Sequence, residues 1–130
     1  MGYCINQRDA NFSIKKENIA KAFEACKTFA DKIDGENYAW VSNSVLKEAK
    51  NLSEFMNEWW WEPSFDADGD IDNIEFTGEK LGDDETLFRI LAPFVKPNSY
   101  IEVGGEDGSF WRWVFKGRKV KEVTPKIDWE

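Results

Sequence analysis

The chain has 130 residues, of which 42% are hydrophobic and 32% charged, and these values predict one globular domain spanning residues 1–130 with a buried core. It contains no histidine, which excludes Ser-His-Asp and Cys-His catalysis, HExxH metalloprotease sites and imidazole metal ligands. The formal net charge of −8, from 17 basic and 25 acidic residues, disfavours nucleic acid as a ligand because phosphate binding needs a basic face.

Neither a membrane span nor a secretory leader is expected. No apolar stretch approaches the length needed to cross a bilayer, and the first residues lack the basic and apolar regions of a signal peptide. We therefore expect a cytoplasmic protein. Two cysteines, Cys4 and Cys26, are too few for a disulfide framework or a four-ligand zinc site, so buried thiols are expected. No cofactor is expected, and the oligomeric state stays open.

The first half of the chain predicts a strand followed by helices. Residues 2–8 read as a strand, and Asp9-Ala10-Asn11 reads as a turn. Across residues 17–33 apolar side chains recur at helical spacing while Lys and Glu fill the other face, which predicts an amphipathic helix. A helical turn is expected within residues 43–50. A second short helix is expected over residues 54–60, with Glu54 near its positive end.

The second half predicts two hairpins separated by a helix. Residues 62–79 are expected to form a hairpin that turns at Asp66-Ala67-Asp68-Gly69, with a bulge or shifted register in its return arm. A third helix is expected to begin after Asp83 or Asp84 and to end at Pro93 or soon after.

The last third gives the clearest pattern. The runs 99–105 and 109–115 flank Glu106-Asp107-Gly108, and Asp-Gly between two β-like runs is a strong hairpin signal. A tight turn at Lys116-Gly117 then leads into residues 118–123. The order β-α-(α)-β-β-α-β-β-β predicts an α+β fold, with two or three helices packed on a mostly antiparallel sheet of five to six strands.

The acidic residues are unevenly spread along the chain. Residues 53–110 hold 15 acidic and three basic residues, a net charge of −12, whereas residues 1–52 carry +1 and residues 111–130 carry +3. This segregation predicts binding to a partner protein with a basic surface. A solvated acidic face that only aids solubility would have the same charge distribution. The residues expected to contact that partner are Asp66, Asp68, Asp70, Asp72, Glu75, Asp83, Asp84, Glu106, Asp107 and Trp61.

Residues 64–75 offer an alternative function, because they partly match an EF-hand calcium loop. Asp66 and Asp68 fall at positions 3 and 5 of that motif, Asp72 at position 9 and Glu75 at position 12. Ser64 replaces the first-position Asp, however, which removes a principal ligand. A turn rich in Asp and Gly explains the same residues without calcium. The alternative is therefore a calcium- or small-ligand-binding domain with those four carboxylates as its ligands.

Two tryptophan-rich segments complete the candidate features. The rings of Trp59-Trp60-Trp61 cannot all face one way, so at least one is expected at the surface, as a platform for a sugar or a protein. The other interpretation is a helix end that fills the core from two sides. Arg112, between Trp111 and Trp113, is expected to pair with a facing Glu. With no histidine and no recognisable catalytic motif, the chain is expected not to be an enzyme.

The run YIEVGGEDGSFWRWVF at residues 100–115 resembles a group of small uncharacterised proteins from gut and soil Firmicutes and from their phages and mobile elements. The resemblance extends to residues 76–85 and to the opening Met1-Gly2-Tyr3. It implies an accessory protein of a phage or mobile element that binds and blocks a host or rival protein. It carries over no functional residues, because that group has no settled activity.

Overall fold

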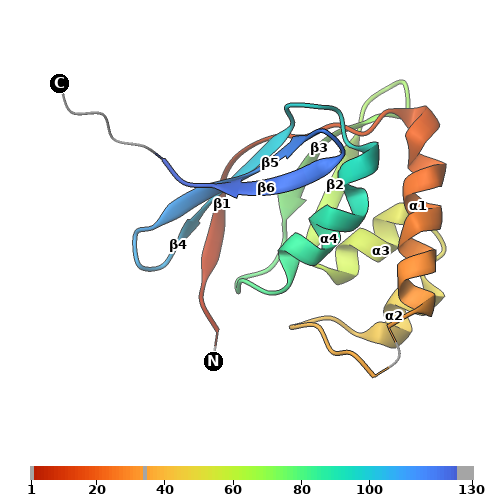
Figure 1. The fold of residues 1–130 in the computed structure, drawn as a ribbon, viewed down its shortest axis with the longest axis horizontal. Helices are drawn as coiled ribbons and strands as arrows, with labels where there is room; N and C mark the ends of the chain where they lie inside the picture. The colour runs from red at the N-terminus through yellow and green to blue at the C-terminus, as the bar shows by residue number, and fades with distance from the viewer. Residues whose placement is uncertain (1, 34, 126–130) are drawn as a thin grey trace.

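The computed structural model describes residues 2–33 and 35–125, and it has the α+β architecture that the sequence predicts. Within these residues the elements in chain order are β1 (Ile5–Asn11), α1 (Lys16–Asp31), α2 (Asn43–Glu48), α3 (Leu52–Glu58), β2 (Trp61–Phe65), β3 (Ile71–Phe76), α4 (Asp84–Leu91), the short 3-10 helix η1 (Ala92–Phe94), β4 (Tyr100–Gly105), β5 (Phe110–Lys116) and β6 (Lys119–Val123). Helices α1, α2 and α3 gather at the end of the molecule away from the β4–β5 turn (Figure 1).

The strands form two antiparallel sheets where one sheet of five to six strands was predicted. One sheet has the order β1-β4-β5-β6 and the other is the β2–β3 hairpin. The edges of β1 and β3 face each other and are joined near both ends, where Ile14 and Ile71 exchange backbone hydrogen bonds of 3.0 and 2.9 Å and the Ile5 N–H donates to the Glu79 carbonyl at 3.0 Å. Between these points the ladder is interrupted, so the prediction of a single sheet was wrong.

Irregular pairing flanks the interruption on both strands. The register of β1 against β4 shifts between Gln7 and Asp9, and the register of β2 against β3 shifts between Ser64 and Phe65. An extra residue in one strand bends it and increases its twist. We attribute the separation of β1 from β3 to these two shifts. The shift in the β2–β3 hairpin agrees with the expected irregularity there.

The predicted turn at residues 9–11 is the second half of β1. Asp9, Ala10 and Asn11 pair with residues 100–102 of β4, and the Asp9 carboxylate accepts a hydrogen bond from the Tyr100 hydroxyl at 2.8 Å. The letters Asp-Ala-Asn are typical of turns, but pairing with a strand ninety positions away overrides that local preference.

The helices follow the apolar periodicity closely, although there are more of them than expected. Helix α1 buries Ala22, Cys26 and Ala30, four residues apart, which confirms the amphipathic pattern. The segments 43–48 and 52–58 form two separate helices, α2 and α3. With α4, the described residues contain four α-helices where two or three were predicted.

A cluster of aromatic rings lies between the helices and the inner face of the larger sheet. Trp113 and Phe115 of β5 contact Phe88 of α4, with ring centroids 4.9 and 5.9 Å apart, and Trp61 contacts Phe88 at 5.2 Å. These rings are fully or almost fully buried. Alternation along the strands places Arg112 and Glu102 on the other face, where Arg112 Nε lies 2.8 Å from Glu102 Oε1. The expected ion pair is therefore confirmed.

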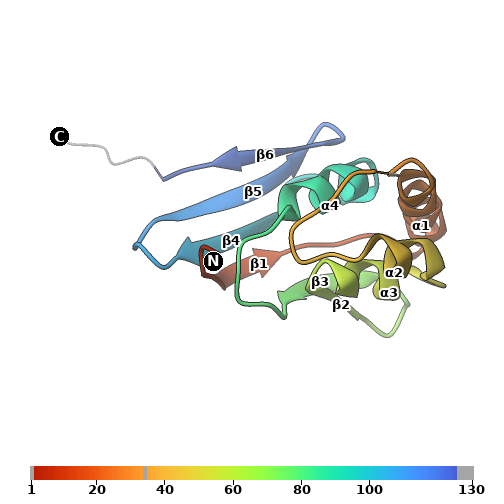
Figure 2. The same cartoon turned by 90° about the horizontal axis from the view of Figure 1, so that it is seen from below.

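The views of Figures 1 and 2 agree on where the turns lie. The β4–β5 turn is at one end of the larger sheet, and the β2–β3 turn is at the other end of the molecule, near the start of α1. This arrangement decides how the predicted binding residues are distributed.

Candidate functional site

The acidic segment between β2 and β3 is a tight turn whose carboxylates bind its own backbone. Asp66 Oδ1 accepts hydrogen bonds from the N–H groups of Asp68 at 2.9 Å and Asp70 at 3.1 Å. Gly69 has a φ of 90°, a conformation that glycine adopts without steric cost. Asp70 Oδ1 accepts a hydrogen bond from the Lys16 N–H at 2.6 Å, which ties the turn to the start of α1. The hairpin predicted at Asp66–Gly69 is confirmed.

This geometry does not bring the EF-hand-like carboxylates together. Asp72 Oδ1 accepts a hydrogen bond from the Ser64 hydroxyl at 2.9 Å, while Asp66 Oδ1 is occupied by the turn. Across residues 2–33 and 35–125, no three or more Cys, Asp or Glu side chains are grouped so that they could hold a metal ion. The positions of Asp66, Asp68, Asp72 and Glu75 along the chain match the motif without forming its ligand shell.

The other predicted contact residues lie at separate places. Asp83, at the start of α4, accepts a hydrogen bond from the Ala39 N–H at 2.8 Å. At the β4–β5 turn, Glu106 Oε1 accepts one from the Cys4 N–H at 2.9 Å, and Asp107 accepts one from the Tyr3 hydroxyl, which holds the pKa of Asp107 below its usual range. This turn and the β2–β3 turn are at opposite ends of the molecule (Figure 2). The acidic residues therefore do not form one continuous surface.

Two of the predicted contact residues are buried, which corrects the expectation that they meet a partner. Trp61 is 0% exposed and Asp84 is 3% exposed. The Trp61 Nε1–H donates to Asp84 Oδ1 at 2.8 Å, and the Gly82 N–H donates to Asp84 Oδ2 at 2.9 Å. Burial raises the pKa of Asp84, and these two hydrogen bonds oppose the rise. Both residues support the fold, and the exposed ring of the tryptophan run is Trp60.

The two thiols differ in their surroundings. Cys26 is buried as expected, and burial raises its pKa to about 12, so it stays protonated and unreactive at neutral pH. Cys4 is only half-buried, so the expectation of a buried thiol was wrong for it. Its Sγ lies 3.1 Å from the Lys80 ammonium, which donates to it.

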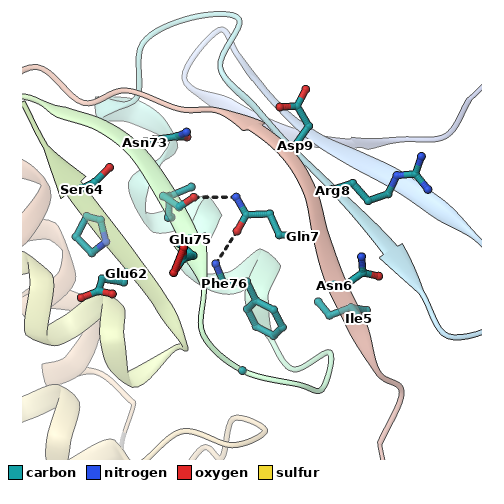
Figure 3. Close-up of a pocket in the computed structure, with 13 residues that line it drawn as sticks. Ile5, Asn6, Gln7, Arg8, Asp9, Glu62, Ser64, Asn73, Glu75 and Phe76 are labelled. Carbon is teal, nitrogen blue, oxygen red and sulfur yellow. Dashed lines mark hydrogen bonds between the residues drawn. The ribbon is translucent and has the colours of Figure 1, made fainter.

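A groove of about 760 Å³ lies between β1 and the β2–β3 hairpin, where the two sheets separate (Figure 3). The Gln7 side chain crosses it, because its Nε2 donates to the Ile74 carbonyl at 2.9 Å and its Oε1 accepts from the Phe76 N–H at 2.6 Å. One amide side chain thus replaces one donor and one acceptor of the missing ladder. Polar side chains dominate the rest of the lining, among them Asn6, Arg8, Asp9, Ser64 and Asn73.

The charged side chains on the β1 side of the groove have partners within the protein. Arg8 Nε lies 3.1 Å from Glu102 Oε2, and the Arg8 guanidinium carbon lies 4.4 Å from the centre of the Phe110 ring. Asp9 accepts hydrogen bonds from Tyr100 and from the Ala10 N–H. This wall therefore presents satisfied groups.

The hairpin side of the groove carries charge that is not neutralised. Glu62 and Glu75 are exposed and stand directly opposite each other on β2 and β3. Neither has a hydrogen-bond or ion-pair partner within the described residues, and like charges placed opposite each other destabilise a strand pair. Asn73 Oδ1, in the same wall, is buried and accepts no hydrogen bond from any described residue. The wall therefore offers two exposed carboxylates without a partner.

Sequence reasoning did not find this groove. Gln7, Glu62 and Asn73 were not singled out, because only the pairing of distant strands brings them together. A weak signal existed at Glu62 and Glu75, since a hairpin centred on Asp66–Gly69 places them across from each other.

No protein-family model, curated protein sequence or solved structure matches this chain. The likeness of residues 100–115 to small Firmicutes proteins therefore stays a prediction. Among the residues that the structure describes, no helix has both the length and the apolar character needed to cross a membrane.

Proposed function

We propose that the chain is a non-enzymatic, intracellular protein-interaction module that binds a basic segment of a partner protein in the groove between β1 and β3. The observation that carries this proposal is the facing pair Glu62 and Glu75, which has no partner of its own. A Lys or Arg side chain placed between these carboxylates relieves their repulsion and adds charge-assisted hydrogen bonds.

The form of the groove also favours a peptide segment as its ligand. Residues of the three strands β1, β2 and β3 line it, so an extended segment can run parallel to these strands. The net charge of −8 attracts a basic partner from a distance and increases its association rate.

The sequence resemblance supplies the setting of this proposal. In that setting the basic segment belongs to a host protein, and binding blocks the surface that the host protein uses. The chain then acts as an accessory protein of a phage or mobile element that inhibits the host protein, and it needs no catalytic group.

Tagged purification from a cell that naturally carries the gene tests the proposal. We expect one stoichiometric, salt-sensitive partner with a basic segment, and we expect the double variant Glu62→Gln and Glu75→Gln to lose it. The matched control replaces Glu17 and Glu24, two exposed residues of α1, by Gln, which changes the net charge by the same amount.

The control distinguishes an effect of the groove residues from an effect of the net charge. Retention of the partner by the α1 variant, with loss by the groove variant, supports the proposal. Equal loss in both variants, or a protein that purifies with no partner at any salt concentration, overturns it.

A further inference from the structure

Beside the groove lies a pocket of about 430 Å³ formed by Trp40, Trp60 and residues 77–80, and the two concavities share Gly78. The two indole side chains are 50% and 44% exposed, respectively. Trp40 lies in the segment before α2, and Trp60 lies between α3 and β2. Their rings are therefore presented to solvent by two segments that are far apart in sequence.

Both tryptophans occupy backbone positions that favour glycine. Trp60 follows the C-cap of α3 with a φ of 70°, and its N–H donates to the Asn57 carbonyl at 2.9 Å. Trp40, with a φ of 66°, precedes Val41, whose N–H donates to the Tyr38 carbonyl at 3.2 Å and closes a turn. Glycine is the usual residue at both kinds of position, and a bulky side chain there is strained. Such strain gathers at functional sites.

Hydrogen bonds fix the Trp60 ring and the backbone around Trp40. The Trp60 Nε1–H donates to the Trp40 carbonyl at 2.9 Å. The residues on either side of Trp40 are also fixed, because Ala39 donates to Asp83 at 2.8 Å and Ser42 donates to Glu58 at 2.7 Å. The pocket is thus formed before any ligand arrives, which lowers the entropic cost of binding.

Two glycines lie close against the tryptophans of the pocket. A Cβ on Gly78 would lie 3.1 Å from Trp60 Cβ and 3.0 Å from Phe76 Cζ. A Cβ on Gly82 would lie 3.1 Å from Trp40 Cδ1. The pocket therefore depends on small residues at both positions.

The pocket lining holds one acidic and one basic residue, Glu79 and Lys80, while the residues that hold the Trp40 segment are acidic. The carboxylates of Asp83 and Glu58 bind that segment. The hydrogen bond to Glu36, together with burial and the charges of Glu36 and Asp83, raises the pKa of the neighbouring Tyr38 to about 12. The cation in the lining, Lys80, donates to Cys4 Sγ.

We infer that this pocket holds an arginine side chain of the basic segment that lies in the groove, and the inference rests on the proposed function. A guanidinium group is planar, stacks on an indole face and binds carboxylates in a fixed geometry. The pocket offers two indoles together with Glu79, and it shares Gly78 with the groove that offers Glu62 and Glu75. A segment that follows the groove therefore reaches the pocket with its next side chains.

N-acetyl-arginine amide is the probe for this inference, and the readout is the indole N–H signals of Trp40 and Trp60 in amide NMR spectra. We expect saturable shifts of both signals, a weaker response to N-acetyl-lysine amide, and none to N-acetyl-leucine amide or methyl glucoside. Trp40→Gly and Trp60→Gly should each abolish the response, because glycine keeps the backbone and removes the ring. Phe65→Ala, which removes another exposed ring at the far end of β2, is the control.

The outcomes separate the pocket from the groove. Absence of a saturable shift, or equal shifts with the leucine amide or the glucoside, overturns the arginine assignment. The Glu62→Gln and Glu75→Gln double variant should still bind the arginine amide at the pocket. If Trp60→Gly keeps the purified partner, the pocket inference fails alone. If only the double variant keeps it, the groove proposal fails alone.

Discussion

Replacing Trp60 by glycine should give a more stable protein than replacing it by alanine, which reverses the usual order of these residues. Both variants lose the same ring contacts and the same hydrogen bond to the Trp40 carbonyl, so these losses cancel in the comparison. Alanine at a φ of 70° keeps a left-handed strain of about 1–2 kcal/mol. Glycine costs about 0.4–1 kcal/mol through the greater freedom of the unfolded chain. The difference in unfolding free energy is therefore about 0.5–1 kcal/mol in favour of glycine.

Urea unfolding of the two variants measures this difference, as a change in midpoint at unchanged slope. The control is Lys21, an exposed residue inside α1, where alanine should exceed glycine by about 1 kcal/mol. If Lys21 shows the normal order and Trp60→Ala is at least as stable as Trp60→Gly, the backbone at residue 60 is not strained. Strain at Trp60 is then no sign of a functional site.

Three further predictions concern buried and crowded groups. Burial raises the pKa of the Asp84 carboxyl above its value in the unfolded chain, so the free energy of unfolding should fall as the pH rises from the unfolded pKa to the folded one. The variant Asp84→Asn does not ionise, so its stability relative to wild type should increase over that pH range, as unfolding measured at a series of pH values would show. A maleimide should label Cys4 in the native protein and Cys26 only after unfolding, as peptide mass spectrometry would show; a native adduct on Cys26 would contradict this. Gly105→Ala should destabilise by about 1–3 kcal/mol, because its Cβ would lie 1.7 Å from the Tyr3 hydroxyl, and little of that loss should remain in a Tyr3→Ala background.

The parts of the fold that sequence reasoning predicted are those set by neighbours along the chain. The hairpin of β4 and β5 turns at Gly108 with a φ of 87°, as Asp-Gly requires. The next turn uses Gly117 and Arg118, both in the left-handed region, and the pairing of β5 with β6 follows from it. The turn at Gly108 sets the register of β4 against β5, and this register places Arg112 opposite Glu102.

The candidate site depends on distant pairings, and for that reason the sequence did not reveal it. Acidic residues of the single segment 53–110 lie at opposite ends of the molecule, because the β2–β3 and β4–β5 turns point to different ends (Figure 1). In the tryptophan run, the backbone conformation of Trp60 decides which ring is exposed to solvent. Trp59 ends the helical segment and Trp61 begins β2, and the left-handed Trp60 between them reverses the chain so that both neighbours point inward.

The separation of β1 from β3 costs backbone hydrogen bonds that the two strand edges could otherwise form. The bridges Cys4–Lys80 and Ile14–Ile71 are both antiparallel and nearly in register, so the two edges are aligned for pairing along their length. Instead, the Gln7 amide supplies a single donor and acceptor, and the groove stays open. The same surface holds the unneutralised Glu62 and Glu75, and next to it the chain holds two strained tryptophans. The interrupted ladder, the facing carboxylates and the two strained tryptophans are therefore neighbours, and this proximity is the reason we propose this surface as the binding site.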